Sequence, residues 1–237
     1  MIKPPIKTNN DKASQISNWI IQQFPNDYAN LRYVEPFVGN GSVILNKIKS
    51  VEEVASDYNP DVIKLWRVVR DENKSLRNKI LKLNYNEKTY ETIKNKKVEK
   101  DYFKEAFSHY VISKMGGNKF SKLDRKKAYR FWKDAAENIY SLEERIKEVY
   151  FLYKSPFETI EKFDNTSALC FCSPPFYEDQ KKSEMTTDEY ISLCDLLLSF
   201  RGKVLLYANN CTFFRRLFKD WKNIKLKGKK NCLWINY

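Results

Sequence analysis

The tetrapeptide Ser173-Pro174-Pro175-Phe176 follows the short apolar run of residues 168–172, and this junction is the strongest constraint on the fold. A short apolar run is typical of a strand buried in a sheet. Two consecutive prolines fix φ and remove two backbone donors, so the loop is stiff and no ladder or helix uses its carbonyls. The tetrapeptide is therefore predicted to lie at the carboxyl end of a buried strand, where open α/β sheets bind their ligands.

The chemistry of this loop suits a planar group that carries an NH₂. The Ser173 hydroxyl and the backbone carbonyls can orient the amine, and the ring of Phe176 can stack on the plane. A Pro-Pro turn after a strand also occurs where it only ends the strand and binds no ligand. The interpretation as a binding site therefore needs a second motif.

Residues 33–42, Tyr-Val-Glu-Pro-Phe-Val-Gly-Asn-Gly-Ser, provide that motif, since they indicate a strand that runs into a glycine turn. Gly39 and Gly41 permit positive φ and a close approach of ligand to backbone. Glu35, at the strand end, would repel a phosphate and attract a cation. The next predicted strand ends in Asp57, which is suitably placed to bond ribose hydroxyls. The ligand implied is a nucleoside with a positive centre.

These motifs, in this order, resemble those of the Dam-like DNA adenine methyltransferases, which use S-adenosylmethionine. Their glycine motif is similar to residues 33–42, their ribose motif to residues 56–61, and their catalytic Asp-Pro-Pro-Tyr motif to residues 173–176. Residues 7–12 occupy the place of an N-terminal Lys-Trp-Ala-Gly-Gly-Lys motif. The resemblance covers nearly the whole chain and implies an α/β fold, a Rossmann-like methyltransferase sheet with an inserted helical target-recognition subdomain.

The resemblance also implies roles for the matching residues. The catalytic set is Ser173, Pro174, Pro175 and Phe176. The cofactor-binding set is Lys7, Lys12, Glu35, Phe37, Gly39, Gly41, Asp57 and Phe157. In this set Glu35 would hold the ammonium group of S-adenosylmethionine, Asp57 its ribose, and Phe157 would pack on its adenine. The implied reaction is methyl transfer to the exocyclic amino group of adenine in double-stranded DNA, after base flipping.

Three departures from the family pattern leave alternatives open. Ser173 replaces the catalytic acid, Pro156 stands where an acid usually bonds the cofactor adenine, and Asn10 and Asp11 replace two glycines. Ser-Pro-Pro-Phe resembles the motif of methyltransferases that act on the amino group of cytosine. A cytosine target is therefore one alternative, and a catalytically inactive nucleic-acid-binding protein on the same scaffold is another. Methyl transfer to RNA or to a protein glutamine amide would use a similar site.

Net charge favours a nucleic-acid partner. The formal charge is +13, and residues 59–150 hold 23 Lys and Arg against 14 Asp and Glu. A basic segment attracts phosphates regardless of base sequence; a solvated lysine-rich surface would have the same composition. Within this segment, the glycine-containing turn of residues 114–120 is predicted to contact DNA through Lys114, Asn118 and Lys119.

Hydrophobic periodicity divides the chain into a catalytic domain of residues 1–70 and 148–237 and an inserted helical DNA-recognition subdomain of residues 71–147. Strands are expected near residues 33–38, 54–57, 148–153, 168–172, 203–208, 223–227 and 231–237. Helices are expected over residues 12–24, 43–48, 59–69, 76–83, 101–115, 125–140, 187–200 and 212–221.

Composition points to an intracellular protein. The chain has no 18-residue apolar run and no signal-peptide pattern, so we expect no membrane partner. Its five cysteines form no C-x-x-C pair and accompany a single histidine, so we expect neither a disulfide framework nor a bound metal. The expected location is the cytoplasm of a bacterial or phage-infected cell, with a restriction nuclease as a possible partner and an open oligomeric state.

Overall fold

The computed structural model describes residues 2–5, 12–84, 86–95, 101–115, 125–177, 185–226, 228 and 230–237, without the side chains of residues 12–15, 125, 127 and 128. The chain forms two compact units. The first, here called the helical unit, comprises Met1–Ser17, Gly39–Lys47 and Asn59–Phe151. The second, the sheet unit, comprises Asn18–Val38, Ile48–Tyr58 and Leu152–Tyr237. The glycine turn and the helix from Pro60 thus cluster with the inserted helices, whereas the sequence-based boundaries place them in the catalytic domain.

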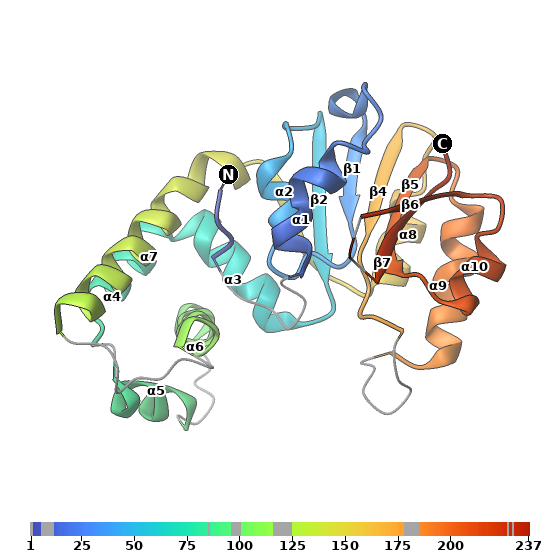
Figure 1. Ribbon diagram of the computed structural model, residues 1–237. Coiled ribbons are helices and arrows are strands. Elements are labelled where there is room, and N and C mark those ends of the chain that lie inside the picture. Colours follow the sequence, from blue (N-terminus) through green and yellow to red (C-terminus); the bar gives the residue numbers. More distant parts are fainter. Residues whose placement is uncertain are drawn as a thin grey trace. The chain divides into compact units, whose positions relative to one another are not determined.

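The strands form one mixed sheet in the order β3-β2-β1-β4-β5-β7-β6 (Figure 1). They are β1 (Arg32–Glu35), β2 (Glu52–Asp57), β3 (Val149–Tyr153), β4 (Ala168–Cys172), β5 (Lys203–Asn209), β6 (Lys222–Lys225) and β7 (Asn231–Ile235). The pairs β1–β2, β1–β4 and β4–β5 are parallel, whereas β7 runs antiparallel to both β5 and β6. The predicted Rossmann-like α/β fold class is confirmed.

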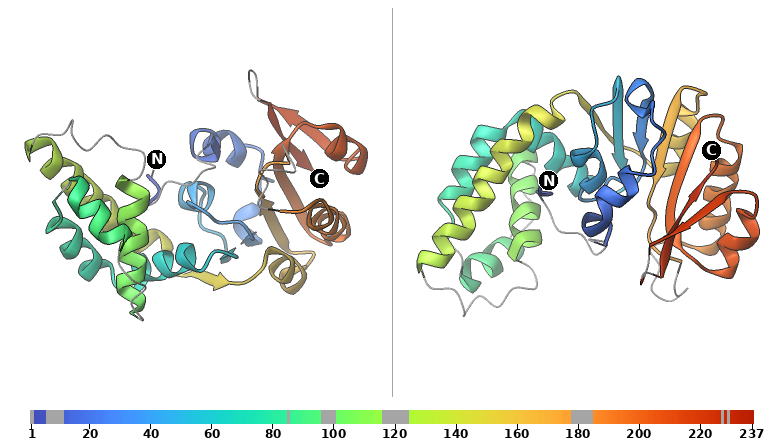
Figure 2. Two further views of the ribbon diagram at one scale, coloured as in Figure 1. Left: turned by 90° about the horizontal axis from the view of Figure 1, so that it is seen from below. Right: turned by 45° about the horizontal axis from the view of Figure 1, so that its top comes forward.

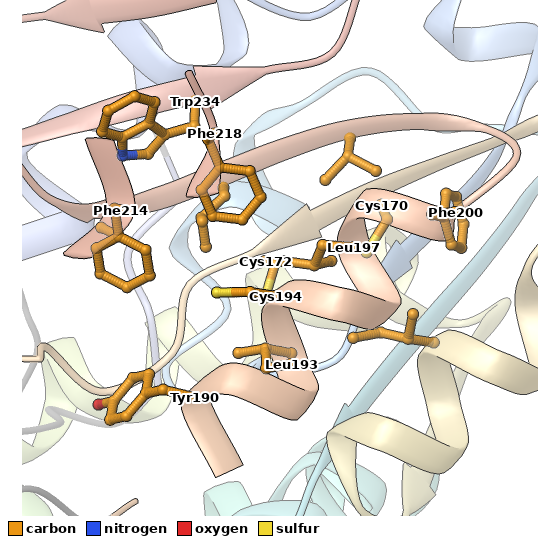
Figure 3. Close-up of a cluster of buried hydrophobic side chains, with 14 of the residues drawn as sticks. Cys170, Cys172, Tyr190, Leu193, Cys194, Leu197, Phe200, Phe214, Phe218 and Trp234 are labelled. Atoms are coloured by element: carbon orange, nitrogen blue, oxygen red, sulfur yellow. The ribbon is translucent and has the colours of Figure 1, made fainter. Parts of the chain in front are cut away.

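The core of the sheet unit lies between the sheet and its helices. These are α8 (Pro156–Phe163), α9 (Thr187–Ser199) and α10 (Thr212–Leu217), with the single turn η1 (Tyr28–Asn30) before β1. Every residue of β4 is buried, as expected for a strand covered on both faces. Figure 3 shows Leu193, Cys194 and Leu197 of α9 packed over Cys170 and Cys172 of β4. All five cysteines are free, and burial raises the pKa of Cys194 to about 12, so its thiol stays protonated and acts as a small apolar side chain.

Helix α8 explains the proline at position 156. Ser155 is its N-cap and accepts from the Glu158 amide, and the Glu158 carboxylate in turn accepts from the Ser155 amide. Pro156 is the first helical residue, where its fixed φ suits a helix and its missing donor is not needed. This helix was not predicted, although Ser-Pro-Phe-Glu is a capping-box pattern.

The helical unit is built from α2 (Ser42–Asn46), α3 (Pro60–Asp71), α4 (Asn73–Leu81), α5 (Glu87–Lys94), α6 (Tyr102–Met115) and α7 (Arg125–Ile146). Helix α1 (Lys12–Ile21) precedes them in the chain. Helices α4 and α7 run side by side (Figure 2). The buried side chain of Asn73 donates through Nδ2 to the carbonyls of Val69, at 3.1 Å, and Ile139, at 2.7 Å. The predicted helices α4, α6 and α7 are present; α5, which buries no residue, was not predicted.

Within the helical unit, the glycine turn packs against Trp66 of α3. Gly39 and Gly41 have φ values of 45° and 66°, in the left-handed region that favours glycine. Trp66 Nε1 donates to the Gly39 carbonyl at 2.9 Å. A Cβ on Gly41 would lie 2.6 Å from Trp66 Cζ2, well inside contact distance. Both the backbone conformation and the space therefore require glycine at position 41.

We predict that Gly41→Ala lowers the free energy of unfolding by about 2–4 kcal/mol, from left-handed strain together with overpacking against the indole. Gly228→Ala is the matched control, because Gly228 has a φ of 76° and a Cβ added there would meet no atom of the described residues within 4 Å. The control should lose only the backbone contribution, about 1–2 kcal/mol. Denaturant unfolding followed by tryptophan fluorescence measures both, and equal losses would contradict the packing argument.

Candidate functional site

The candidate site lies at the carboxyl edge of the parallel strands. β1 pairs with β2 on one side and with β4 on the other, with Val34 opposite Cys170. The chain proceeds from β1 to β2 in one direction along the sheet, and from β4 to β5 in the other. The point where the order reverses is where open α/β sheets bind ligands. Glu35, at the end of β1, and Ser173, directly after β4, flank this point.

Glu35 is a buried carboxylate with a tyrosine partner. Its side chain is 3% exposed, and it accepts a hydrogen bond of 2.8 Å from the Tyr33 hydroxyl. Burial and then the neighbouring carboxylate raise the pKa of Tyr33 well above its ordinary value, so the phenol stays protonated and donates. A buried carboxylate of this kind is suited to a cationic ligand.

Asp57 ends β2, the neighbouring strand, and is also buried. The residue before it, Ser56, donates through its hydroxyl to Thr159 Oγ1 of α8 at 2.8 Å. The Ser56 carbonyl accepts from the Val38 amide at 2.9 Å, which ties the segment after β1 to the end of β2. These bonds hold the two acidic strand ends in a defined arrangement within the sheet unit.

Residues 173–176, here called the rim, follow β4 without regular secondary structure. Pro174 is buried, while Ser173, Pro175 and Phe176 are half-buried. The Phe176 ring meets the Tyr207 ring edge to face, with centroids 5.8 Å apart. Within the described part of the chain, neither the Ser173 hydroxyl nor the Pro174 carbonyl takes part in a hydrogen bond. Both are therefore available as acceptors for a ligand.

Two aromatic residues of the predicted cofactor set lie in or beside the core. Phe37 is 8% exposed, belongs to the same apolar cluster as Cys170, and lies edge to face with Tyr58 at 6.4 Å between centroids. Phe157, in the first turn of α8, is half-buried and packs against that cluster. A core role accounts for these contacts, and cofactor contact by either ring stays a prediction.

The remaining predicted residues belong to the helical unit or lie outside the described residues. In the glycine turn, the Asn40 side chain accepts from the Ser42 amide at 3.0 Å. Lys114, in the last turn of α6, donates to the Pro4 carbonyl at 3.4 Å and lies 5.8 Å from the centre of the Tyr110 ring. Lys7, Asn118 and Lys119, and the side chain of Lys12, are outside the described residues.

The sequence interpretation missed several residues that the fold brings to this edge. Tyr33 precedes Glu35 by two positions, and residues i and i+2 of a strand share a face, so its contact could have been anticipated. Thr159, Tyr190 and Asn209 had no comparable signal, because they come from distant segments of the chain.

The site combines buried carboxylates, neutral oxygen acceptors and aromatic rings. Among the described residues, no group of three or more His, Cys, Asp or Glu side chains could hold a metal ion. No helix in the described part of the chain is long and apolar enough to cross a membrane. These groups can bind a cationic nucleoside and orient an amine.

Comparison with known proteins gives two kinds of similarity. The D12 class N6 adenine-specific DNA methyltransferase family matches residues 14–232. The Type II methyltransferase M.MjaIII of Methanocaldococcus jannaschii is 25% identical over 271 residues, covering 98% of this chain and 93% of that protein.

Among solved structures, the rRNA methyltransferase aviRa from Streptomyces viridochromogenes has a TM-score of 0.44 and 9% identity, over 98% of this chain and 88% of that one. A conserved hypothetical protein of Streptococcus pyogenes has a TM-score of 0.42 and 12% identity, over 94% of each chain.

The family match extends from helix α1 to strand β7 and includes both the glycine turn and the rim. It confirms the resemblance read from the motifs, and with it the adenine target. The chain therefore belongs to the D12 class N6 adenine-specific DNA methyltransferase family, and it is a site-specific DNA methyltransferase that acts on adenine.

Proposed function

We propose that this methyltransferase takes its methyl group from S-adenosylmethionine and holds the target adenine, flipped out of duplex DNA, against the rim. The observation that carries the proposal is the parallel pairing of β1 with β4. This pairing sets the buried carboxylate of Glu35 and the acceptors of the rim on neighbouring strands at the point where the strand order reverses.

The residues present fit S-adenosylmethionine, which supplies a methyl group on a sulfonium when it is bound. Glu35 would pair with its ammonium group, since a buried carboxylate gains most from an opposite charge. Asp57 would accept from the ribose hydroxyls. Phe37 and Phe157 would border the adenine, Gly39 and Gly41 would present backbone to the methionine portion, and Lys7 and Lys12 would neutralise the carboxylate.

At the rim, the task of the protein is to orient a poor nucleophile. The lone pair of an adenine amino group is delocalised into the ring, so the amine must be held with that pair directed out of the plane. The Ser173 hydroxyl and the Pro174 carbonyl would accept its two N–H bonds, and Phe176 would stack on the base. Flipping the base costs a few kcal/mol, and positioning the reactants contributes roughly 7–11 kcal/mol to the rate acceleration.

We propose that the inserted helical segment of residues 71–147 recognises the DNA. Its excess of Lys and Arg supports this role, since cations supply sequence-independent attraction to phosphates. Lys114, Asn118 and Lys119 are the residues proposed to contact DNA.

The proposed cellular setting is the cytoplasm of a bacterial or phage-infected cell. A restriction nuclease that cuts the same site is the proposed partner. The Type II name of the relative from Methanocaldococcus jannaschii supports this setting.

The decisive test is methyl transfer itself. Incubation with isotopically labelled S-adenosylmethionine and duplex DNA of diverse sequence should place label in N6-methyladenine after digestion to nucleosides. Label in methylated cytosine, or no label in any nucleoside, would contradict the proposal. The same reaction with labelled donor and RNA is the control for substrate class.

We predict that Ser173→Ala slows methyl transfer about tenfold, because one amine acceptor is lost. Ser173→Asp should speed transfer, because a charge-assisted hydrogen bond is about twice as strong as a neutral one. Ser199→Ala, at the exposed end of α9, is the matched control and should leave the rate unchanged. A wild-type rate in Ser173→Ala would remove Ser173 from the catalytic set.

We predict that Glu35→Gln weakens binding of S-adenosylmethionine about 10- to 100-fold, since hydrogen bonds to charged groups contribute about 1.5–3 kcal/mol. Isothermal titration calorimetry measures the dissociation constant. Glu52→Gln is the control, because Glu52 begins β2, away from the carboxyl edge of the sheet, and its half-buried carboxylate pairs with Arg32. If Glu35→Gln binds as tightly as the control does, the ammonium assignment is wrong.

A further inference from the structure

The rim is held in place by two side chains that the proposed reaction does not use directly. Tyr190 donates through its hydroxyl to the Pro175 carbonyl at 2.7 Å. Asn209 donates through Nδ2 to the Tyr177 carbonyl at 2.8 Å. We infer that Tyr190 and Asn209 are positioning residues, which fix the rim so that Ser173 and Pro174 present their acceptors to the amine. The inference rests on the proposed function of the rim.

Tyr190 is itself rigidly held. It lies in the first turn of α9, directly after the capping box formed by Thr186 and Glu189. Its side chain is 1% exposed, and its ring packs edge to face against Phe214 at 6.4 Å between centroids. Because this buried phenol is held by its packing, its hydrogen bond to the Pro175 carbonyl fixes the orientation of that peptide group.

Asn209 is placed by the sheet, because it ends β5, the strand that runs parallel to β4. It is 7% exposed, and its Oδ1 is buried without a hydrogen-bond partner in the described part of the chain. A buried acceptor with no partner lowers stability, so packing alone does not favour asparagine at this position. Departures of this kind are expected at functional sites.

An aromatic contact holds the same segment. The Tyr177 ring stacks on Phe213, with centroids 4.6 Å apart and planes inclined by 18°. It also meets Tyr190 edge to face at 5.0 Å. Tyr190 therefore contacts the segment twice, through its hydroxyl at Pro175 and through its ring at Tyr177. The chain is fixed on the downstream side of the residues proposed to hold the base.

These bonds decide which acceptors remain. The carbonyls of Pro175 and Tyr177 accept hydrogen bonds from Tyr190 and Asn209, and these bonds fix the directions in which the two carbonyls point. The Ser173 hydroxyl and the Pro174 carbonyl take part in no hydrogen bond within the described residues. Without the two donors, the rim could turn other carbonyls toward the base, and a misplacement of about 1 Å lowers the rate strongly.

The test compares Tyr190→Phe and Asn209→Ala with matched controls in the same unit. Tyr237→Phe also removes a tyrosine hydroxyl that donates to a backbone carbonyl, that of Gln23 at 3.0 Å. Asn236→Ala also removes an amide donor, to the Gly202 carbonyl at 3.0 Å, and in addition loses the acceptor of the Val204 amide. Each control therefore loses at least as many of the hydrogen bonds named here as its test variant does.

We expect Tyr190→Phe and Asn209→Ala each to slow the single-turnover rate of methyl transfer to adenine roughly 5- to 10-fold, the effect of one lost hydrogen bond. Their dissociation constants for S-adenosylmethionine and DNA should stay within about twofold of the wild type, since the rim is not proposed to supply most of the binding energy. Both controls should keep the wild-type rate, even where their thermal unfolding midpoints fall further.

Two outcomes overturn the inference. Rates in the test variants that match their controls would show that the bonds are only structural. A loss of rate that follows the fall in unfolding midpoint across all four variants would show the same. If the wild-type protein transfers methyl groups to adenine, these outcomes refute the positioning role alone. If the wild-type protein transfers none, the proposed function fails, and the positioning role fails with it.

Discussion

The parallel pairing of β1 with β4 is the contact on which the rest of the site depends. These strands are far apart in the chain, and their hydrogen bonds set the register that places Val34 opposite Cys170. Because the strands are parallel, both carboxyl ends meet at one edge of the sheet. The register therefore places Glu35, at the end of β1, and Ser173, directly after β4, at that same edge. A slip of one residue would turn Glu35 to the other face, so the buried pairing also fixes the direction of the carboxylate.

At the ends of β1 and β2, two buried hydrogen bonds join polar side chains. Tyr33 donates to Glu35, and Ser56 donates to Thr159, so these buried side chains have partners before any ligand binds. Such satisfied pairs hold a site rigid, which favours catalysis by positioning. The apolar core beneath, with its protonated thiols in β4 and α9, provides the support (Figure 3).

The sequence predicted the sheet better than it predicted the short helices. Every strand was expected within a few residues of its observed bounds, because apolar runs and alternation are strong local signals. Helix α5 was missed because none of its residues is buried, so no apolar stripe marks it. Helix α8 was missed because Pro156 was considered only as the replacement of an acid that the family usually has at this position. Its local role is to begin a helix after the Ser155 N-cap.

The sequence by itself determined the family, the mostly parallel fold and the two motifs. Glycine turns, acidic strand ends and a Pro-Pro loop are short, contiguous patterns, so they can be recognised in the sequence without a structure. The tertiary structure alone decided which strands are neighbours and which side chains hold the rim. Tyr190 and Asn209 come from α9 and β5, and no local pattern links either to residues 173–176. Contacts between segments distant in the chain are set by the packing of the whole sheet, which a local pattern does not contain.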